Sequence, residues 1–285
     1  YYGLGDYIGK IRKFIISDSL ELINYREFNH MRFTHISSNN QDKLFIAGRG
    51  VNDPDVSVDY FINFTFLNYD LNTIYESTTW SVEAGTSILA GTETSYLTRG
   101  IHNNANDDVI CFYTIYFNNQ YYTKVVKFSL ENGNYTKTVN LLEGIDYNSI
   151  QGLQSCHTIE NGQDYYYLVG KNISGTNVRT SIYKLNNNLE IVLEKNINLG
   201  DDGENPMKIQ GTNNGVIIAG EIQNIYNDDS DSDLENSMVM FNDDEADYRS
   251  IFLFKVNRSL NEEWILLNGL QNVNDDLMDF TVNDE

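Results

Sequence analysis

The strongest constraint in this sequence is an internal repeat that joins an apolar strand to a polar turn and then to a leucine or its equivalent. Around it, β-branched and aromatic residues alternate between short polar turns along nearly the whole chain, and helical periodicity is almost absent. A pattern that recurs at intervals predicts an array of similar units rather than one irregular sheet. The copies occupy residues 14–20, 64–71, 126–133, 183–189 and 254–260.

A second repeated piece is a strand, an Asn-rich or Gly-containing turn, and an apolar strand that usually ends in Gly. It occupies residues 33–48, 156–170 and 209–220, with a degenerate copy that ends at 109–113. Together the two pieces predict units of four antiparallel strands with a period of roughly 50 to 70 residues. We therefore expect an all-β chain that forms one β-propeller domain over residues 1–285, with five four-stranded blades. The expected blade limits are about 10–59, 60–120, 121–179, 180–250, and 251–285 together with 1–9.

The two ends of the chain complement each other in this scheme. The last repeat reaches residues 280–285 where its final strand should begin, and residues 1–5 precede the first full strand. Residues 1–23 align with residues 166–192 of the third repeat. We expect the N-terminal strand to complete the C-terminal blade, which would close the ring and remove unpaired sheet edges.

Residues 182–186 and 214–220, followed by 252–256 and Trp264, resemble the propeller repeats of large secreted and surface bacterial proteins, whose blades have approximately the pattern vKld-nGnilW … dGGyiiaG. The resemblance is good over residues 180–270 and poor over 60–120. It implies the fold and leaves the chemistry open, because such blades serve many binding and scaffolding roles.

Composition excludes some partners. The formal net charge is −22, which opposes binding to nucleic-acid phosphates and to anionic lipid. No apolar run has the length of a membrane span. The chain opens at Tyr1 without Met, so either a leader was removed or the sequence is a fragment, and we favour removal of a secretory signal. We therefore expect an extracellular or cell-surface protein that does not bind nucleic acid or insert into membranes.

Calcium is the one cofactor that the sequence suggests. Asp229, Asp231 and Asp233 have the alternate spacing of a calcium loop. Leu234 stands where the helix–loop–helix motif needs Gly, and Met240 where it needs Glu. A solvated acidic loop is the alternative. His35, His102 and His157 occupy one place in successive repeats, which we assign to the third strand at mid-radius, too far apart to share a metal.

Modification and redox chemistry remain open at several positions. Cys111 and Cys156 fall in apparent strands, either as a disulfide or as two buried thiols. Asn-x-Ser/Thr sequons predict glycosylation where a turn or connection exposes the asparagine. Three sequons fall on expected turns or connections, whereas the fourth lies within a strand; they are Asn134, Asn172, Asn257 and, in the strand, Asn63.

The pattern favours a non-catalytic extracellular structural or interaction propeller, such as a subunit of a surface assembly or filament. Its partners would be other protein subunits, including copies of itself, or surface glycans. A lectin is the alternative, because Tyr121-Tyr122 and Tyr165-Tyr166-Tyr167 could offer flat faces to sugars or protein partners. We favour packing of alternate tyrosines between the blades over such a surface. A glycan-cleaving enzyme is the second alternative. It would need acidic residues on the inner strands, where we expect lysines instead, namely Lys13, Lys127, Lys184 and Lys255.

Overall fold

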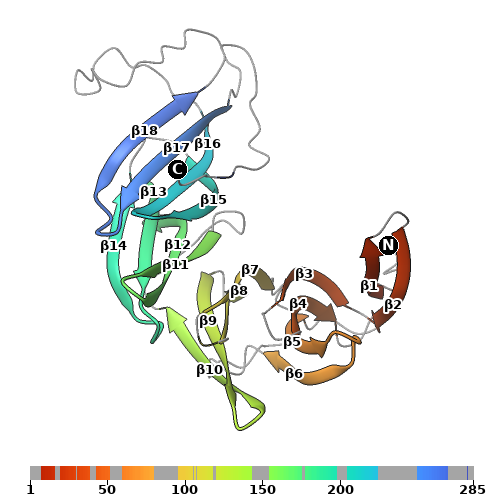
Figure 1. The fold of residues 1–285 in the computed structure, drawn as a ribbon. Coiled ribbons are helices and arrows are strands. Elements are labelled where there is room, and N and C mark those ends of the chain that lie inside the picture. The colour runs from red at the N-terminus through yellow and green to blue at the C-terminus, as the bar shows by residue number, and fades with distance from the viewer. Residues whose placement is uncertain are drawn as a thin grey trace, which may run out of the picture. The chain divides into compact units, whose positions relative to one another are not determined.

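The computed structural model consists of antiparallel β-sheets (Figure 1). It describes residues 8–16, 20–29, 31–38, 43–51, 60–79, 96–104, 106, 108–117, 120–142, 154–174, 177–197, 204–223, 249–268 and 281. No helix occurs within these ranges, and hence none that is long and apolar enough to cross a membrane. The chain divides into two compact units, an N-terminal unit Tyr1–Gly144 and a C-terminal unit Ile145–Glu285.

The N-terminal unit contains three sheets in which each strand pairs with the next one in the sequence. The first has two strands, β1 (Ile8–Ile16) and β2 (Leu20–Asn29). The second has β3 (Met31–Ser38), β4 (Lys43–Val51), β5 (Tyr60–Asn68) and β6 (Thr73–Thr79). The third has β7 (Tyr96–Asn103), β8 (Val109–Phe117), β9 (Gln120–Glu131) and β10 (Asn134–Leu142).

The C-terminal unit contains two further sheets of the same up-and-down kind. One has β11 (Gln154–Glu160), β12 (Gln163–Ser174), β13 (Asn177–Leu185) and β14 (Ile191–Ile197). The other has β15 (Glu204–Thr212), β16 (Gly215–Gln223), β17 (Arg249–Asn257) and β18 (Glu262–Asn268). The expectation of an all-β chain built from four-stranded antiparallel sheets is therefore confirmed.

The sheets begin at other residues than the repeat limits predicted, which corrects the blade boundaries. We expected a unit at 10–59, but residues 31–79 form one sheet, because β4 pairs with β5 across residues 52–59. A repeating series of strands can be divided into groups of four from any strand. The alternation of apolar and polar residues therefore does not show which hairpins pair to form one sheet. The hairpin of the two-stranded sheet β1–β2 corresponds to the last two strands of a four-stranded sheet.

A recurring turn explains the leucine of the repeat. Asn68, Asn186 and Asn257 each accept hydrogen bonds from the backbone N–H groups two and four residues later. The third residue after each asparagine has a positive φ and a buried side chain, at Leu71 (φ 63), Leu189 (φ 65) and Leu260 (φ 59). The asparagine side chain thus closes the turn while the leucine enters the core.

Two tight hairpins follow the expected Asn-Gly chemistry. Asn132-Gly133 joins β9 to β10 and Asn161-Gly162 joins β11 to β12. All four of these residues have positive φ, as a two-residue hairpin loop matched to strand twist requires.

Each unit has a core between two facing sheets. In the N-terminal unit, Phe64, Phe66 and Phe128 are buried between β3–β6 and β7–β10. In the C-terminal unit, Tyr167 and Phe254 belong to the core between β11–β14 and β15–β18. The first strands of the latter two sheets approach closely, because a Cβ on Gly211 of β15 would lie 2.6 Å from Cγ2 of Thr158 in β11. Within each unit, the two four-stranded sheets therefore pack face to face.

Candidate functional site

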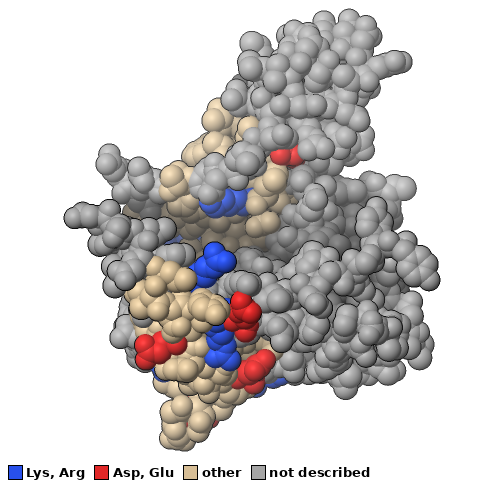
Figure 2. All heavy atoms as spheres, turned by 90° about the vertical axis from the view of Figure 1, so that its right-hand side faces the viewer, with Lys and Arg blue, Asp and Glu red and all other residues tan. Residues whose placement is uncertain are grey.

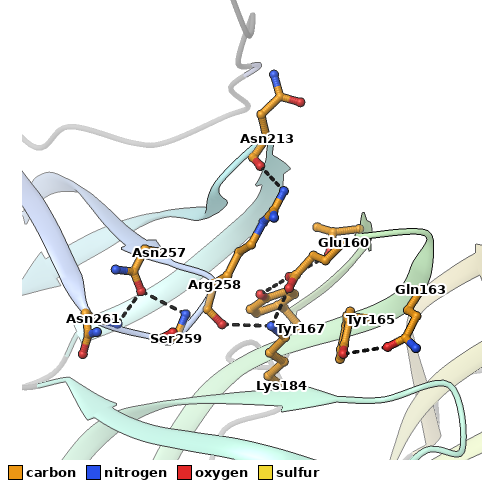
Figure 3. A network of polar contacts seen from close by, with 11 residues as sticks. Glu160, Gln163, Tyr165, Tyr167, Lys184, Asn213, Asn257, Arg258, Ser259 and Asn261 are labelled. Atoms are coloured by element: carbon orange, nitrogen blue, oxygen red, sulfur yellow. Dashed lines mark hydrogen bonds and ion pairs between the residues drawn. The ribbon is translucent and has the colours of Figure 1, made fainter.

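The most elaborate polar cluster among the described residues lies between the two sheets of the C-terminal unit (Figure 3). Glu160 ends β11, just before the Asn161-Gly162 hairpin, and Tyr167 stands opposite Lys184 in the pairing of β12 with β13. Hairpin and register together bring one carboxylate, one phenol and one ammonium group to the same side of the sheet.

Lys184 and Glu160 form a buried ion pair. Nζ of Lys184 lies 2.7 Å from Oε2 of Glu160, and the side chains are only 6% and 8% exposed. The Tyr167 hydroxyl donates to Oε1 of Glu160 at 2.5 Å. Nζ also donates to the carbonyl oxygen of Arg258 at 2.9 Å and lies 4.3 Å from the ring centroid of Tyr165. Each charge thus has several partners that offset the cost of its burial.

The Tyr167 hydroxyl stays protonated in this environment. Burial raises the pKa of Tyr167 well above its usual value, and the hydrogen bond to Glu160 and the charge of that carboxylate raise it further. A phenol held neutral beside a carboxylate is a hydrogen-bond donor. The ion pair and the tyrosine hydrogen bond therefore tie β11, β12 and β13 together within one sheet, and the hydrogen bond from Lys184 to Arg258 joins that sheet to the next.

The lysines singled out in the sequence do not lie on inner strands, contrary to expectation. Lys127, Lys184 and Lys255 lie on the third strand of their sheets, and Lys13 lies on β1. We had assumed that the strand with the lysine is the inner strand of its blade. In the four-stranded sheets two other strands precede it, so the lysine lies on the third strand. Nζ of Lys127 lies 2.8 Å from Oδ2 of Asp108, and Nζ of Lys255 lies 3.1 Å from Oε2 of Glu263.

A similar cation-to-turn contact links β1–β2 to the next sheet. Nη1 of Arg26 in β2 donates to the carbonyl oxygen of Leu71 at 2.7 Å, and Nδ2 of Asn24 donates to that of Asp70 at 2.9 Å. Both acceptors belong to the asparagine turn after β5, as Arg258 belongs to the one after β17. A cation of one sheet thus bonds the equivalent turn of the next sheet in both units.

The histidines occupy first strands rather than third strands, which corrects their predicted position. His35 lies in β3, His102 in β7 and His157 in β11. Nε2 of His157 lies 2.8 Å from Oδ1 of Asp164, and its ring is stacked on Tyr166 with centroids 5.2 Å apart. Within the described ranges, no group of three or more His, Cys, Asp or Glu side chains could hold a metal ion. The calcium candidates Asp229, Asp231 and Asp233 lie outside the described residues.

The sequons differ in accessibility. Asn134 begins β10 and is exposed, whereas Asn63 in β5 is only 2% exposed and its Nδ2 donates to Oε1 of Glu76 at 2.6 Å. Asn257 is half-buried and holds the turn after β17. Asn172 does not lie on a connection as expected, because β12 extends to Ser174 and pairs Asn172 with Arg179.

Both cysteines are free and buried, so the thiol alternative holds. Burial raises the pKa of Cys111 and of Cys156 well above the usual range. Tyr166 and Tyr167 are fully buried rather than offered to a ligand. The interpretation that tyrosines of these clusters pack inside the fold therefore holds for these two residues.

Most exposed large apolar side chains among the described residues lie on the last strand of a sheet, namely β2, β6, β14 or β18. On β14, Ile191, Val192 and Leu193 form a run with exposed fractions of 38%, 43% and 38%. The other exposed large apolar residues of outer strands are Leu22, Ile23 and Tyr25 on β2, Ile74 on β6, and Trp264 and Leu266 on β18. Sequence reasoning missed this surface, although the unbroken apolar runs 191–193 and 264–267 are a readable signal in strands at a sheet edge.

No family model matches this chain, and no curated protein matches it either.

Charges on the surface are mixed rather than segregated in the view of Figure 2. Among the described residues on that face, blue Lys and Arg side chains lie beside red Asp and Glu side chains. A field of one sign that would steer a polyanion or a polycation does not stand out there.

The outer strands are poorly suited to backbone pairing with a partner. A β-bulge interrupts each pairing of the third strand with the fourth in the sheets β3–β6, β11–β14 and β15–β18. In β14 the additional residue is Val192, because Leu193 pairs with Lys184 and Ile191 pairs with Leu185. Bulges twist an edge and disrupt its ladder of hydrogen bonds, so a partner would contact side chains there.

Proposed function

We propose that this chain is a non-catalytic, extracellular interaction module, built as a five-bladed β-propeller of the kind found in secreted bacterial repeat proteins. The observation that carries the proposal is the exposed apolar run Ile191-Val192-Leu193 on the outer strand β14. Three consecutive exposed apolar residues are costly in water and are characteristic of a surface that is covered by a partner. The bulge at Val192 favours contact through side chains.

The two-stranded sheet supports the count of five blades. β1–β2 lacks the first two strands of a full sheet, but Arg26 bonds the turn of the next sheet as Lys184 does in the C-terminal unit. The hairpin thus has the contacts of the outer half of a blade. In the proposed ring, the two ends of the chain would supply the inner half; the residues involved, 1–5 and 280–285, lie outside the described ones apart from Thr281.

Exposed side chains on the last sheet and on β2 support closure of that ring. On the last sheet, Phe252 and Phe254 face the core, so Leu253 and its partner Leu266 face the other side, where Leu266 is 53% exposed. On β2, Tyr25 alternates with Asn24 and Arg26, which bond the next sheet, and Tyr25 is 58% exposed. If the face of the last sheet that carries Leu266 packed on the face of β2 that carries Tyr25, both side chains would be buried.

Closure is tested by distances between spin labels on the full chain. The test pair is Leu22→Cys with Glu262→Cys, on β2 and β18. The reference pair is Val192→Cys with Glu262→Cys, on the outer strands of two sheets in one unit. The buried native thiols react slowly, so labels go to the new cysteines. A closed ring gives similar distances for both pairs. A test distance far longer than the reference would exclude the ring.

The interaction surface is tested by self-association. Light scattering and negative-stain microscopy at physiological calcium should reveal assemblies of the wild-type chain, and Val192→Asp should abolish them. Thr73→Asp, at an exposed polar position of β6, is the matched control and should leave them intact. Dispersed monomers of the wild type, or equal assembly of Val192→Asp, would contradict the proposed role of β14.

A further inference from the structure

The connection between β7 and β8 brings an amide, a carboxylate and an amine together. Asn104 and Asp108 are both buried, and Oδ2 of Asp108 accepts a hydrogen bond from Nδ2 of Asn104 at 3.1 Å. Nζ of Lys127, on β9, lies 2.8 Å from the same oxygen atom, and 20% of the lysine side chain is exposed. One carboxylate oxygen therefore bridges an amine and the amino group of a carboxamide.

The carbonyl group of that carboxamide is polarised by the backbone. Oδ1 of Asn104 accepts hydrogen bonds from the backbone N–H groups of Asn106 at 2.9 Å and of Asp108 at 3.0 Å. Two N–H donors on one carbonyl oxygen stabilise the negative charge that develops there when a nucleophile attacks the carbon atom. The turn thus makes Cγ of Asn104 an electrophile in the same group that contains the amine of Lys127.

Comparison with another asparagine turn shows what is particular to this one. In the turn after β13, Nδ2 of Asn186 donates to Oε2 of Glu190 at 2.8 Å, which is the same contact between an amide and a carboxylate. The lysine of that sheet, Lys184, is paired with Glu160 instead. A turn of this kind therefore needs no lysine, and the amine beside Asp108 is a group that the turn itself does not require.

We propose that Lys127 and Asn104 form an intramolecular isopeptide bond, with Asp108 as the proton acceptor and donor. A proton passes from the Lys127 ammonium group to Asp108, and the lone pair of the neutral amine forms a bond to Cγ of Asn104. The bond between Cγ and Nδ2 breaks, and Nδ2 takes the proton from Asp108 and leaves as ammonia. Nζ releases a second proton to solvent and keeps one hydrogen, so the product is a secondary amide and the balance needs no oxidant.

The bond joins the connection before β8 to the third strand of the same sheet. It closes a loop that contains β8, so it restricts the unfolded chain more than the folded chain, as a disulfide does. Unlike a disulfide, it is not broken by reducing agents. The proposal is independent of the interaction surface on β14, because Asn104, Asp108 and Lys127 all belong to the N-terminal unit.

Mass spectrometry of the full chain, after incubation in the folded state, tests the proposal. The wild-type chain should be lighter than its sequence by the mass of one ammonia, and tandem spectra of a digest should contain a branched peptide that joins Lys127 to Asn104. Lys127→Arg keeps the positive charge beside Asp108 and should have the full mass. A wild-type chain of full mass, or a lighter chain without the branched peptide, would overturn the proposal.

The role of Asp108 is tested by removing the proton acceptor. Asp108→Asn should lower the linked fraction several-fold, and circular dichroism checks that this variant has formed its sheets. Equal linkage in Asp108→Asn and in the wild type would overturn the role assigned to the carboxylate. Lys127→Arg stays decisive for the bond itself if Asp108→Asn does not fold.

A more exposed group of the same composition provides a control in the other unit. Nζ of Lys255 lies 3.1 Å from Oε2 of Glu263, and Nδ2 of Asn214 donates to Oε1 of Glu263 at 3.0 Å. Here the two nitrogen atoms contact different oxygen atoms, and water has access to the exposed Asn214. Lys255→Arg should therefore leave the mass loss of the wild type unchanged. Loss of the linkage in this variant would contradict the assignment of the bond to Lys127.

Discussion

The ammonium group of Lys184 in β13 donates a hydrogen bond to the carbonyl oxygen of Arg258, which lies 2.9 Å away in the turn after β17. The same ammonium group is paired with Glu160, so a single lysine joins three elements of two sheets. An ion pair at this depth does not stabilise a fold strongly compared with apolar packing of equal volume. It does penalise any pairing register of β11, β12 and β13 that would separate the charges.

Lys184→Met should therefore destabilise the chain by about 3 to 5 kcal/mol, because Glu160 would remain buried without its cation. The double variant Lys184→Met/Glu160→Leu should recover most of that loss, since no unpaired charge remains. Lys255→Met is the matched control at a more exposed pair and should cost less than about 1 kcal/mol. Urea unfolding measures all three. A double variant no more stable than Lys184→Met would contradict this account.

Tyr167 should make stability fall at alkaline pH. In the unfolded chain this phenol ionises near its usual pKa of about 10, whereas in the folded chain burial and Glu160 hold it protonated. Above pH 10 the unfolded chain therefore binds fewer protons than the folded chain. The contribution of Tyr167 to the free energy of unfolding is complete below pH 10 and declines as the pH rises above it. Each such group contributes a slope of about −1.4 kcal/mol per pH unit there.

Tyr167→Phe should accordingly flatten the pH dependence of the free energy of unfolding between about pH 10 and 11.5. Urea titrations at several pH values give the slope, and Tyr25→Phe, at an exposed tyrosine, is the control expected to leave it unchanged. Equal slopes for the wild type and Tyr167→Phe would show that the phenol is not held neutral by its surroundings.

Several features of this fold could be predicted from the sequence because local chemistry determines them. A two-residue hairpin loop requires positive φ at both residues, and Asn-Gly at 132–133 and 161–162 adopts it readily. The repeated leucine marks the asparagine turns of β5, β13 and β17. In each case the controlling residues are near neighbours in the chain.

The pairing of hairpins and the buried network could not be predicted in this way. Glu160 and Lys184 are 24 positions apart and Lys184 and Arg258 are 74 apart, so their contact depends on sheet packing. The positions of the histidines and lysines were wrong for a related reason. The sequence pattern does not show which strand begins each sheet, so these residues were assigned to the wrong strand of the sheet. Aromatic clusters occur in surfaces and in cores, so the sequence favoured packing for Tyr166 and Tyr167 but left a binding surface open, and the structure shows both residues buried.

Gly215 should be far less tolerant of substitution than Gly133. Both have positive φ, but a Cβ at Gly215 would lie 2.0 Å from the carbonyl oxygen of Val256, whereas nothing lies within 4 Å of one at Gly133. Gly215→Ala should cost about 3 kcal/mol from strain and displacement of β17, and Gly133→Ala about 1 kcal/mol from strain alone. Thermal unfolding compares them. Equal losses would mean that β16 can move away from β17 at little cost.

The thiols of Cys111 and Cys156 should be unreactive in the folded chain. Both are buried and their pKa values are raised by burial, so little thiolate is present at pH 8. Ellman's reagent should titrate almost no thiol in the native protein and two per chain in guanidinium chloride. No titratable thiol after unfolding without reductant would instead reveal a disulfide.

Glycosylation should discriminate between Asn134 and Asn63 when the chain is secreted from a eukaryotic host. The acceptor nitrogen of Asn134 lies at an exposed strand start, and Thr136 of its sequon is exposed as well. Asn63 is buried and bonded to Glu76, so a glycan there would prevent β5 from packing, and any secreted folded chain should lack it. Intact mass before and after glycosidase treatment should lose one glycan on Asn134→Gln and none on Asn63→Gln. A glycan at Asn63 in folded, secreted protein would mean that the face of β5 is open to solvent, and the core between β3–β6 and β7–β10 would then need to be redrawn.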